Sequence, residues 1–418
     1  MTDTPDVIVV GAGLAGLAAA RELTIAGADV VVVDAADEVG GRVRTDVVDG
    51  LLLDRGFQVL NPAYPEVRRL LDLPALDLRP LVPGVVAITD AGPRRLADPR
   101  RRPQWLSDAM TSDTGSVLSK ARLARYVARA VSRTNRGSTA SDDLPAGVAL
   151  RSAGVDSRLV DQVVGPFMSG VFGEDGLTTS RRFMDLVLTS LVNGTPSVPA
   201  RGMQAVPRQL LDALPDGTVR LGTRVLEAGA GWVRTAEGTV RAHEVIVATD
   251  PTTAASLVPG VVVPPGRDLT TWYFVADCPA DDLTDGEGVV VVDHRGPLAN
   301  AVAISNAAPE YAPGGRVLVA ASAVGVRDRL EDEHEARAHL ARMFGTDTRR
   351  WEAVACYPLR YALPAMLPPL SVRRPVRMTD GLIVAGDHRD TASVQGALVS
   401  GRRAARAALS AQRATPSA

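Results

Sequence analysis

Lysine and cysteine are both scarce in this chain of 418 residues. Lys120 is the single lysine among 46 basic residues, so any chemistry that needs a lysine side chain must use it. Cys278 and Cys356 are the two cysteines, too few for a disulfide framework or a cysteine-built metal site. The five histidines are scattered, and we expect no metal centre.

Long apolar runs and an excess of one charge are also missing. No apolar run reaches the roughly 18 residues that a membrane span needs. The formal net charge is −2, so nucleic acid is not an expected partner. The first six residues lack the basic and apolar regions of a signal peptide. These absences predict a soluble, cytoplasmic protein, and the length predicts more than one subdomain.

The N-terminus carries the pattern of a dinucleotide site. An apolar run at 6–10 is typical of a buried parallel strand, and Gly11, Gly13 and Gly16 follow it at once. Gly11 permits a tight turn, Gly13 lets the backbone approach a pyrophosphate, and Gly16 lets helix and strand pack closely. A helical pattern over 17–26 then leads to a second strand that ends in Asp34, the acid expected to bond the ribose hydroxyls.

A second glycine run favours flavin over nicotinamide. Gly40 and Gly41 let the chain pass beside a cofactor, and Arg42 can bridge both phosphates. Here the sequence resembles the flavin amine oxidase and phytoene desaturase superfamily, whose second cofactor signature is a Gly-Gly-Arg run. The run at 53–58 resembles the segment of that family that passes the flavin ring.

The resemblance returns near the other end of the sequence. Gly386 and Asp387 end a strand, and Val394 opens a helix. In the family, the aspartate of Gly-Asp bonds the ribityl or phosphate part of FAD. The helix that follows aims its N-terminal amides at the flavin pyrimidine carbonyl. Between the two ends, the runs at 198–203, 219–225 and 244–251 also resemble family segments, and the second of these would place Val225 against the adenine.

The resemblance therefore implies non-covalent FAD that is held by several separate segments. The residues expected to bind it are Gly11, Gly13, Leu14, Ala15, Gly16, Asp34, Ala35, Gly40, Gly41, Arg42, Gly56, Phe57, Gln58, Val225, Gly386, Asp387, Val394 and Gln395.

Three returns to the cofactor predict an α/β fold with a discontinuous, Rossmann-like FAD-binding domain. We expect this domain to comprise residues 1–75, 195–260 and 374–418. An α+β substrate domain is inserted in two parts. The part at 76–194 reads as mostly helical, and the part at 261–373 alternates like an antiparallel sheet.

The stretch from Arg94 to Arg136 is strongly basic. Ten arginines and Lys120 lie there with three aspartates, and Arg122, Arg125, Arg129 and Arg133 form one stripe of a helix. Such a helix can rest weakly on an anionic membrane surface. It can also pack on the core with a solvated arginine edge, which we favour because its apolar face is short and lacks tryptophan.

The family contains two kinds of enzyme, and the sequence has features that help to choose between them. Amine oxidases take hydride from a carbon next to nitrogen, whereas protoporphyrinogen oxidase and the carotenoid or squalene desaturase types dehydrogenate large apolar molecules. Amine oxidases of the family use a lysine near flavin N5 and an aromatic ring just after the C-terminal Gly-Asp or Gly-Glu. Lys120 does not match that position, and no aromatic residue occurs from Ala362 to Ala418. The run at 360–364 also resembles the desaturase branch.

Four residues are candidates for the chemistry. His388 follows Asp387 and is expected either to act as a base or hydrogen-bond donor or to have a structural role. Phe57, Tyr357 and Tyr361 are candidates for the pocket wall. Cys356 precedes Gly386 by about the distance at which monoamine oxidases, which this region resembles, carry a flavin-linking cysteine. The residues just before Cys356 differ from those of the monoamine oxidases, so the resemblance does not imply a covalent link.

These observations predict an FAD-dependent oxidoreductase that dehydrogenates a small apolar substrate, isoprenoid or polycyclic, by hydride transfer to flavin N5. A flavin amine oxidase with an altered aromatic cage is one alternative. A non-catalytic flavin-carrying binding protein is the other.

Overall fold

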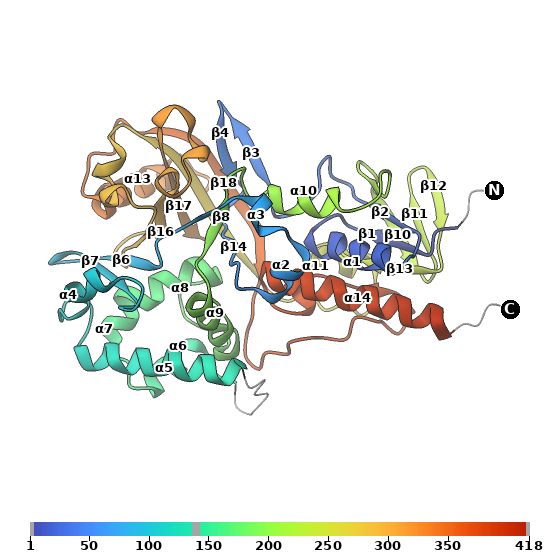
Figure 1. The fold of residues 1–418 in the computed structure, drawn as a ribbon, viewed down its shortest axis with the longest axis horizontal. Helices are drawn as coiled ribbons and strands as arrows, with labels where there is room; N and C mark the ends of the chain where they lie inside the picture. Colours follow the sequence, from blue (N-terminus) through green and yellow to red (C-terminus); the bar gives the residue numbers. More distant parts are fainter. Residues whose placement is uncertain (1–3, 136–142, 415–418) are drawn as a thin grey trace.

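The computed structural model describes residues 4–135 and 143–414, which fold around two separate sheets (Figure 1). Of the basic stretch, Arg136 lies outside the described residues, as do residues 1–3 and 415–418 of the expected FAD-binding domain.

The first sheet is parallel and has the strand order β19-β13-β1-β2-β9. Its strands come from three distant stretches of the chain, namely β1 (Val7–Val10), β2 (Val30–Val33), β9 (Val219–Arg220), β13 (Glu244–Val247) and β19 (Ile383–Val384). A parallel sheet of this origin confirms the α/β, Rossmann-like fold, while the domain boundaries stay a prediction.

The two faces of this sheet are covered differently. Val7 and Val9 pack against helices, whereas Ile8 and Val10 pack on the other side, as the alternation of side chains along a strand requires. The helical side is covered by α1 (Leu14–Ile25), α2 (Pro65–Leu70), α10 (Ala205–Asp212) and α14 (Val394–Ala414). The opposite side is covered by β10 (Val225–Gly229), β11 (Trp232–Thr235), β12 (Gly238–Arg241) and α11 (Pro251–Leu257).

Helix α1 begins three residues before the start that the sequence pattern predicts. Gly13 is its N-cap residue, so the glycine turn leads directly into the helix. The long helix α14 packs on α1 so closely that a Cβ atom at Gly401 would lie 2.1 Å from the carbonyl oxygen of Ala15. The first and last helices therefore form one layer on the same face of the parallel sheet (Figure 1).

The second sheet has seven strands and lies in the two inserted parts that are predicted to bind substrate, which we call the substrate half. The order is β18 (Glu352–Pro364), β14 (Gly266–Ala276), β17 (Val317–Val324), β16 (Leu298–Ala303), β15 (Val290–Val292), β6 (Gly84–Thr89) and β7 (Gly92–Ala97). All neighbours are antiparallel except β15 and β6. Helix α13 (Leu330–Phe344) covers one face, where Ala336 and Leu340 join the core.

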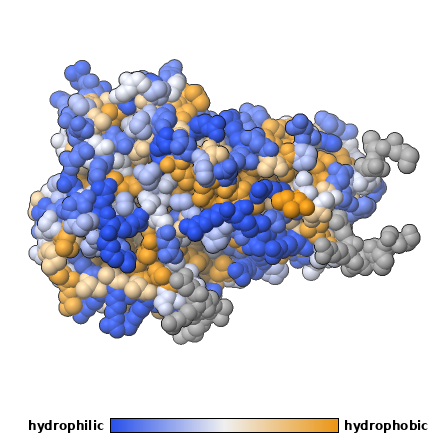
Figure 2. Space-filling view, viewed as in Figure 1, coloured by the Kyte–Doolittle hydropathy of each residue, from blue (hydrophilic) through white to orange (hydrophobic). Residues whose placement is uncertain are grey.

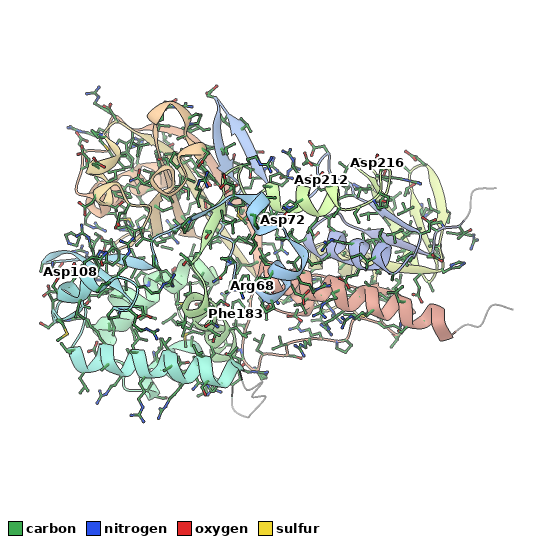
Figure 3. All side chains as sticks on the ribbon, in the orientation of Figure 1. Arg68, Asp72, Asp108, Phe183, Asp212 and Asp216 are labelled. Carbon is green, nitrogen blue, oxygen red and sulfur yellow. The ribbon has the colours of Figure 1, made fainter. Side chains whose placement is uncertain are left out.

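Helices are the main elements of residues 76–194. They are α3 (Leu73–Leu76) at the entry, then α4 (Leu106–Ala109), α5 (Val117–Asn135), α6 (Ala146–Ser152), α7 (Ser157–Leu159), α8 (Gly165–Phe172) and α9 (Arg181–Asn193). Phe183 on α9 is buried in their common core (Figure 3). The sequence pattern did not indicate the hairpin β6–β7. A six-residue apolar run such as β6 is compatible with either a helix or a strand.

Helix α5 turns its apolar side to the protein. Tyr126 and Ala130 are buried, Leu123 packs against the same core, and Arg133 forms an ion pair with Asp185 of α9. The structure therefore agrees with a core-facing helix that has an arginine edge, and its apolar face is covered.

Short elements connect the two halves. They are the hairpin β3 (Thr45–Val48) and β4 (Leu51–Asp54), the pair β5 (Leu78–Pro80) and β8 (Ser197–Pro199), and α12 (Ile304–Ala307). Polar and apolar residues alternate over the face shown in Figure 2. Within 4–135 and 143–414, no helix has the length and apolarity to span a bilayer.

Candidate cofactor and substrate site

The first glycine turn leaves an open space beside Gly13. A Cβ atom at Gly16 would lie 1.8 Å from the carbonyl oxygen of Gly11, so a side chain cannot fit there. At Gly13, by contrast, an added Cβ atom would meet nothing within 4 Å, and this residue opens α1 without a side-chain cap. Free amides at a helix N-terminus beside open space suit an anionic phosphate group.

The second glycine run lies against the first. The Gly40 amide donates to the carbonyl oxygen of Ala12 at 2.9 Å, and a Cβ atom at Gly41 would approach the Cα atom of Gly13 to 3.6 Å. Both glycines have positive φ, where other residues are strained. The two runs together leave a backbone-lined cradle that fits a pyrophosphate.

Arg42 joins this cradle to the far end of the chain. Its guanidinium forms an ion pair with Asp387 at 2.7 Å and donates to the carbonyl oxygen of Ala362 at 3.0 Å. Partial desolvation opposes the charge of Arg42, whose side chain is 41% exposed, but the Asp387 carboxylate outweighs it and raises the pKa of Arg42. The structure thus brings the two expected FAD ligands together, and their contacts with phosphate and ribityl groups stay predictions.

Asp34 lies at the end of β2 beside the glycine turn. Its carboxylate accepts hydrogen bonds from the backbone amides of Ala12 at 2.6 Å and Ala36 at 2.8 Å. The Thr223 amide donates to the carbonyl oxygen of Asp34 at 2.7 Å, which brings the segment before Val225 to the same place. Among the other expected ligands, Leu14 and Ala15 are buried in the first turn of α1, and Ala35 is exposed.

The C-terminal motif supplies the start of α14. The Ser393 hydroxyl accepts from the Gly396 amide, and the amides of Val394 and Gln395 lie in the first turn, where an α-helix offers no acceptor. The Gln395 side chain, however, accepts from the Glu66 amide at 3.0 Å. The oxygen of its carboxamide therefore faces α2, while its backbone amide lies in the first turn of α14.

His388 is buried directly after Asp387. Its side chain packs beside Gly386, and neither ring nitrogen has a hydrogen-bond partner among the described residues. Burial lowers the pKa of His388 to about 4. The ring is therefore neutral at pH 7, with one nitrogen able to donate and the other able to accept.

The segment at 56–58 connects the cradle with the second sheet. Gly56 has a φ of +94°, and a Cβ atom there would lie 2.7 Å from the Leu359 side chain on β18. The Gln58 amide group donates to the carbonyl oxygen of Arg42 at 2.9 Å, and the Phe57 amide donates to the Thr271 hydroxyl at 3.4 Å. Gln58 therefore positions the Gly-Gly-Arg loop.

The two candidate tyrosines use their hydroxyl groups within the protein. Tyr357 donates to Asp46 at 2.9 Å, and its ring meets that of Tyr273 edge-on with centroids 6.1 Å apart. Tyr361 donates to the carbonyl oxygen of Pro264 at 2.6 Å. Burial raises the pKa of Tyr361 to about 12. Both residues are thus fixed rings rather than free acids.

Cys356 is the exposed neighbour of Tyr357 on β18. Its thiol donates to the carbonyl oxygen of Arg327. Partial desolvation, followed by the charges of nearby acids such as Asp328, raises the pKa of Cys356 to about 11 although the residue is largely exposed. Successive side chains of a strand point to opposite faces, so Cys356 lies on the face away from Tyr357. A neutral thiol in this place supports non-covalent flavin, which stays a prediction.

A buried carboxylate that the sequence analysis did not single out ties the segments together. Asp54 accepts hydrogen bonds from the Thr45 hydroxyl at 2.5 Å, the Met203 amide at 2.9 Å and the Tyr311 hydroxyl at 2.8 Å. Burial raises the pKa of Asp54 to about 6, although these donors act against the shift. Its partners are distant in sequence, so no local motif reveals it.

Other polar features lie away from this site. Lys120 donates to the carbonyl oxygen of Thr111 at 2.6 Å, at the start of α5. A cavity of about 530 Å³ lies at the β6–β7 edge of the second sheet, and its arginines Arg95, Arg295 and Arg342 are all paired with aspartates. No group of residues in the described chain has the composition of a metal site.

Comparisons with known proteins agree with the geometry. The flavin-containing amine oxidoreductase family matches residues 14–409. Putrescine oxidase of Kocuria rosea is 51% identical over 67 residues, which is 16% of this chain and 14% of that protein. The mitochondrial protoporphyrinogen oxidase of Nicotiana tabacum is 26% identical over 255 residues, 53% of this chain and 50% of that protein. The solved structure of putrescine oxidase with putrescine bound has a TM-score of 0.72 at 20% identity, over 98% of this chain and 99% of that one.

Proposed function

The chain belongs to the flavin-containing amine oxidoreductase family, and on that premise we propose that it dehydrogenates an apolar substrate of isoprenoid or polycyclic type. FAD, when bound, supplies a hydride acceptor at N5 of its flavin ring. The residues that would hold it are the cradle of Gly13, Gly40 and Gly41, the pair Arg42 and Asp387, and the first turn of α14.

The position of Lys120 carries this proposal. The amine oxidases that the sequence resembles use a lysine near the flavin to assist the reaction with oxygen, and this chain has one lysine. Its ammonium group is bound to Thr111 beside α5, and Asp113 and Asp156 are the acids near it. Without a lysine at the flavin, we expect the reduced protein to pass its electrons to an acceptor other than oxygen.

The walls of the site also favour an apolar substrate. Phe57, Leu359 and Tyr357 lie where the 56–58 segment meets β18, and the tyrosine hydroxyl is already bonded to Asp46. The alignment with tobacco protoporphyrinogen oxidase, which extends over half of each chain, supports the same branch. Oxidation of an amine is the second candidate, supported by the likeness to putrescine oxidase.

The proposal is tested by mixing the yellow protein anaerobically with polyprenoids, reduced tetrapyrroles and amines in turn. We expect the flavin absorbance to bleach with one of the first two and not with amines. Bleaching by amines alone, or rapid peroxide formation when air is admitted, contradicts the proposal. A flavin that stays oxidised with every compound would favour a non-catalytic binding protein.

A further inference from the structure

Four polar residues form a row across the second sheet. Tyr357 of β18 is paired with Thr271 of β14, Thr271 with Ser322 of β17, and Ser322 with Asn300 of β16. Paired residues of neighbouring strands share a face, so all four lie on one side of the sheet. It is the side that the 56–58 segment approaches, because the Phe57 amide donates to the Thr271 hydroxyl.

The row is hydrogen-bonded at its centre and open at the Asn300 end. The hydroxyl groups of Thr271 and Ser322 are 2.9 Å apart. Asn300 is 5% exposed, yet its Oδ1 atom has no hydrogen-bond partner in the described part of the chain. A buried polar group without a partner costs free energy, so such a group in a native fold requires an explanation.

The backbone is shaped to present this amide. The pairing of β16 with β17 shifts by one residue between Leu298 and Asn300, which is a β-bulge. Leu298 packs on the α13 side, and the bulge returns Asn300 to the opposite face. Helix α8 passes directly over it, since a Cβ atom at Gly170 would lie 1.9 Å from Nδ2 of Asn300. A side chain at residue 170 would displace the amide.

The chemistry of the row selects a neutral ligand group. The row itself carries two hydroxyls, a phenol and a carboxamide, with no ionised group to compensate a buried ammonium or carboxylate. The unpartnered Oδ1 atom needs a donor, which an N–H or O–H group supplies. Two strand spacings, roughly 10 Å, separate Asn300 from Thr271, whose hydroxyl is contacted by the Phe57 amide. A ligand group bound by Asn300 would therefore lie well away from Phe57.

We propose that Asn300, held by the bulge and by Gly170, accepts a hydrogen bond from one neutral N–H or O–H group of an otherwise apolar substrate. This inference rests on the proposed function for the location of the substrate. It narrows the substrate to apolar molecules that carry such a group, and it disfavours pure hydrocarbons and tertiary amines.

The test uses the intact flavin-loaded protein and two pairs of neutral probes, N-benzylbenzamide with its N-methyl derivative and geranylgeraniol with its methyl ether. Binding is followed anaerobically by the change in the oxidised flavin spectrum. We expect the N–H or O–H member of at least one pair to bind about tenfold more tightly than its methylated partner. In Asn300→Leu and in Gly170→Ala that preference should disappear.

Matched variants separate recognition from folding and from bulk. Asn306→Leu removes an asparagine that bonds backbone carbonyls outside the row, and it should keep the preference. Asn300→Leu should unfold at the same temperature as the parent or higher, because it removes an unpartnered polar group. The inference is overturned if neither pair of probes shows a preference in the parent protein. It is also overturned if the preference survives in Asn300→Leu, because the weaker binding of the methylated probe would then come from the bulk of its added methyl group. This experiment measures binding and does not require turnover. A flavin that no compound reduces would refute the proposed function, but a preference for the N–H or O–H probe that depends on Asn300 would still stand.

Discussion

The nucleotide-binding half and the substrate half of this protein are built by different means. Around the cradle, main chain meets main chain, and Gly11, Gly16, Gly40 and Gly401 all lie where a Cβ atom would come within 3 Å of a backbone oxygen. In the seven-stranded sheet, large side chains such as Trp272 and Phe274 interdigitate instead. The first kind of contact demands one residue type, whereas the second accepts many combinations of similar volume.

The largest effects should come from substitutions of the glycines in the nucleotide-binding half. One of two such variants should fail to fold, and the other should fold but fail to bind FAD. Gly16→Ala places a methyl group against the carbonyl oxygen of Gly11, neither of which can move, so we expect a loss of more than about 4 kcal/mol and little folded protein. Gly13→Val points into open space and should fold normally but retain no FAD. Circular dichroism and flavin absorbance on the purified variants measure the two outcomes.

A folded Gly13→Val protein with normal flavin content would remove the proposed cradle. An unfolded Gly13→Val protein would show that the space beside this residue is required by the fold itself, which contradicts the contrast drawn with Gly16.

The same difference explains what could be read from the sequence. The strand, glycine turn and acid at 6–34, the Gly-Gly-Arg run and the Gly-Asp before α14 were all recognisable, because each geometric requirement leaves a fixed residue type at a fixed spacing. The ion pair between Arg42 and Asp387 was not foreseen, although both residues were singled out, because 345 positions separate them.

In the substrate half, little could be read beyond the class of structure. Thr271, Asn300 and Ser322 are ordinary residues in three separate strands, and a bulge that no local pattern marks brings the asparagine onto their common face. Asp54 escaped notice for the same reason. Its three donors come from residues 45, 203 and 311.

His388 offers a second way to sharpen the comparison, through the pH dependence of stability. Its pKa is about 4 in the folded protein, against about 6.5 when unfolded. The unfolded chain therefore binds the proton more readily between these values, and stability falls as the pH falls from about 6.5 towards 4. Between pH 7 and pH 5 the loss should be about 2 kcal/mol.

His388→Phe, which cannot titrate and removes two unpartnered nitrogens, should lose this pH-dependent part of the stability. Urea unfolding of both proteins at pH 7 and pH 5 measures it. Equal pH dependence in the two proteins would show that the ring is protonated freely in the folded state, and so is not buried as described.

The smallest effect is expected where the two halves join. Tyr311 of the substrate half donates to the Asp54 carboxylate, whereas Tyr273 donates to the Asp54 backbone carbonyl, so the pair of Tyr→Phe variants separates charge from packing. Loss of the Tyr311 donor should raise the pKa of Asp54 further above its present value of about 6, because the ionised form loses a partner. A raised carboxyl pKa makes stability fall as the pH rises through that range.

Urea unfolding of the two variants tests this expectation. Tyr311→Phe should lower the free energy of unfolding by about 1 to 2 kcal/mol more at pH 8 than at pH 5, and Tyr273→Phe should lower it equally at both. If both variants gave one pH-independent loss, Asp54 would keep a single protonation state between pH 5 and pH 8, its pKa would not lie near 6, and no change of charge would take part in holding the two halves together.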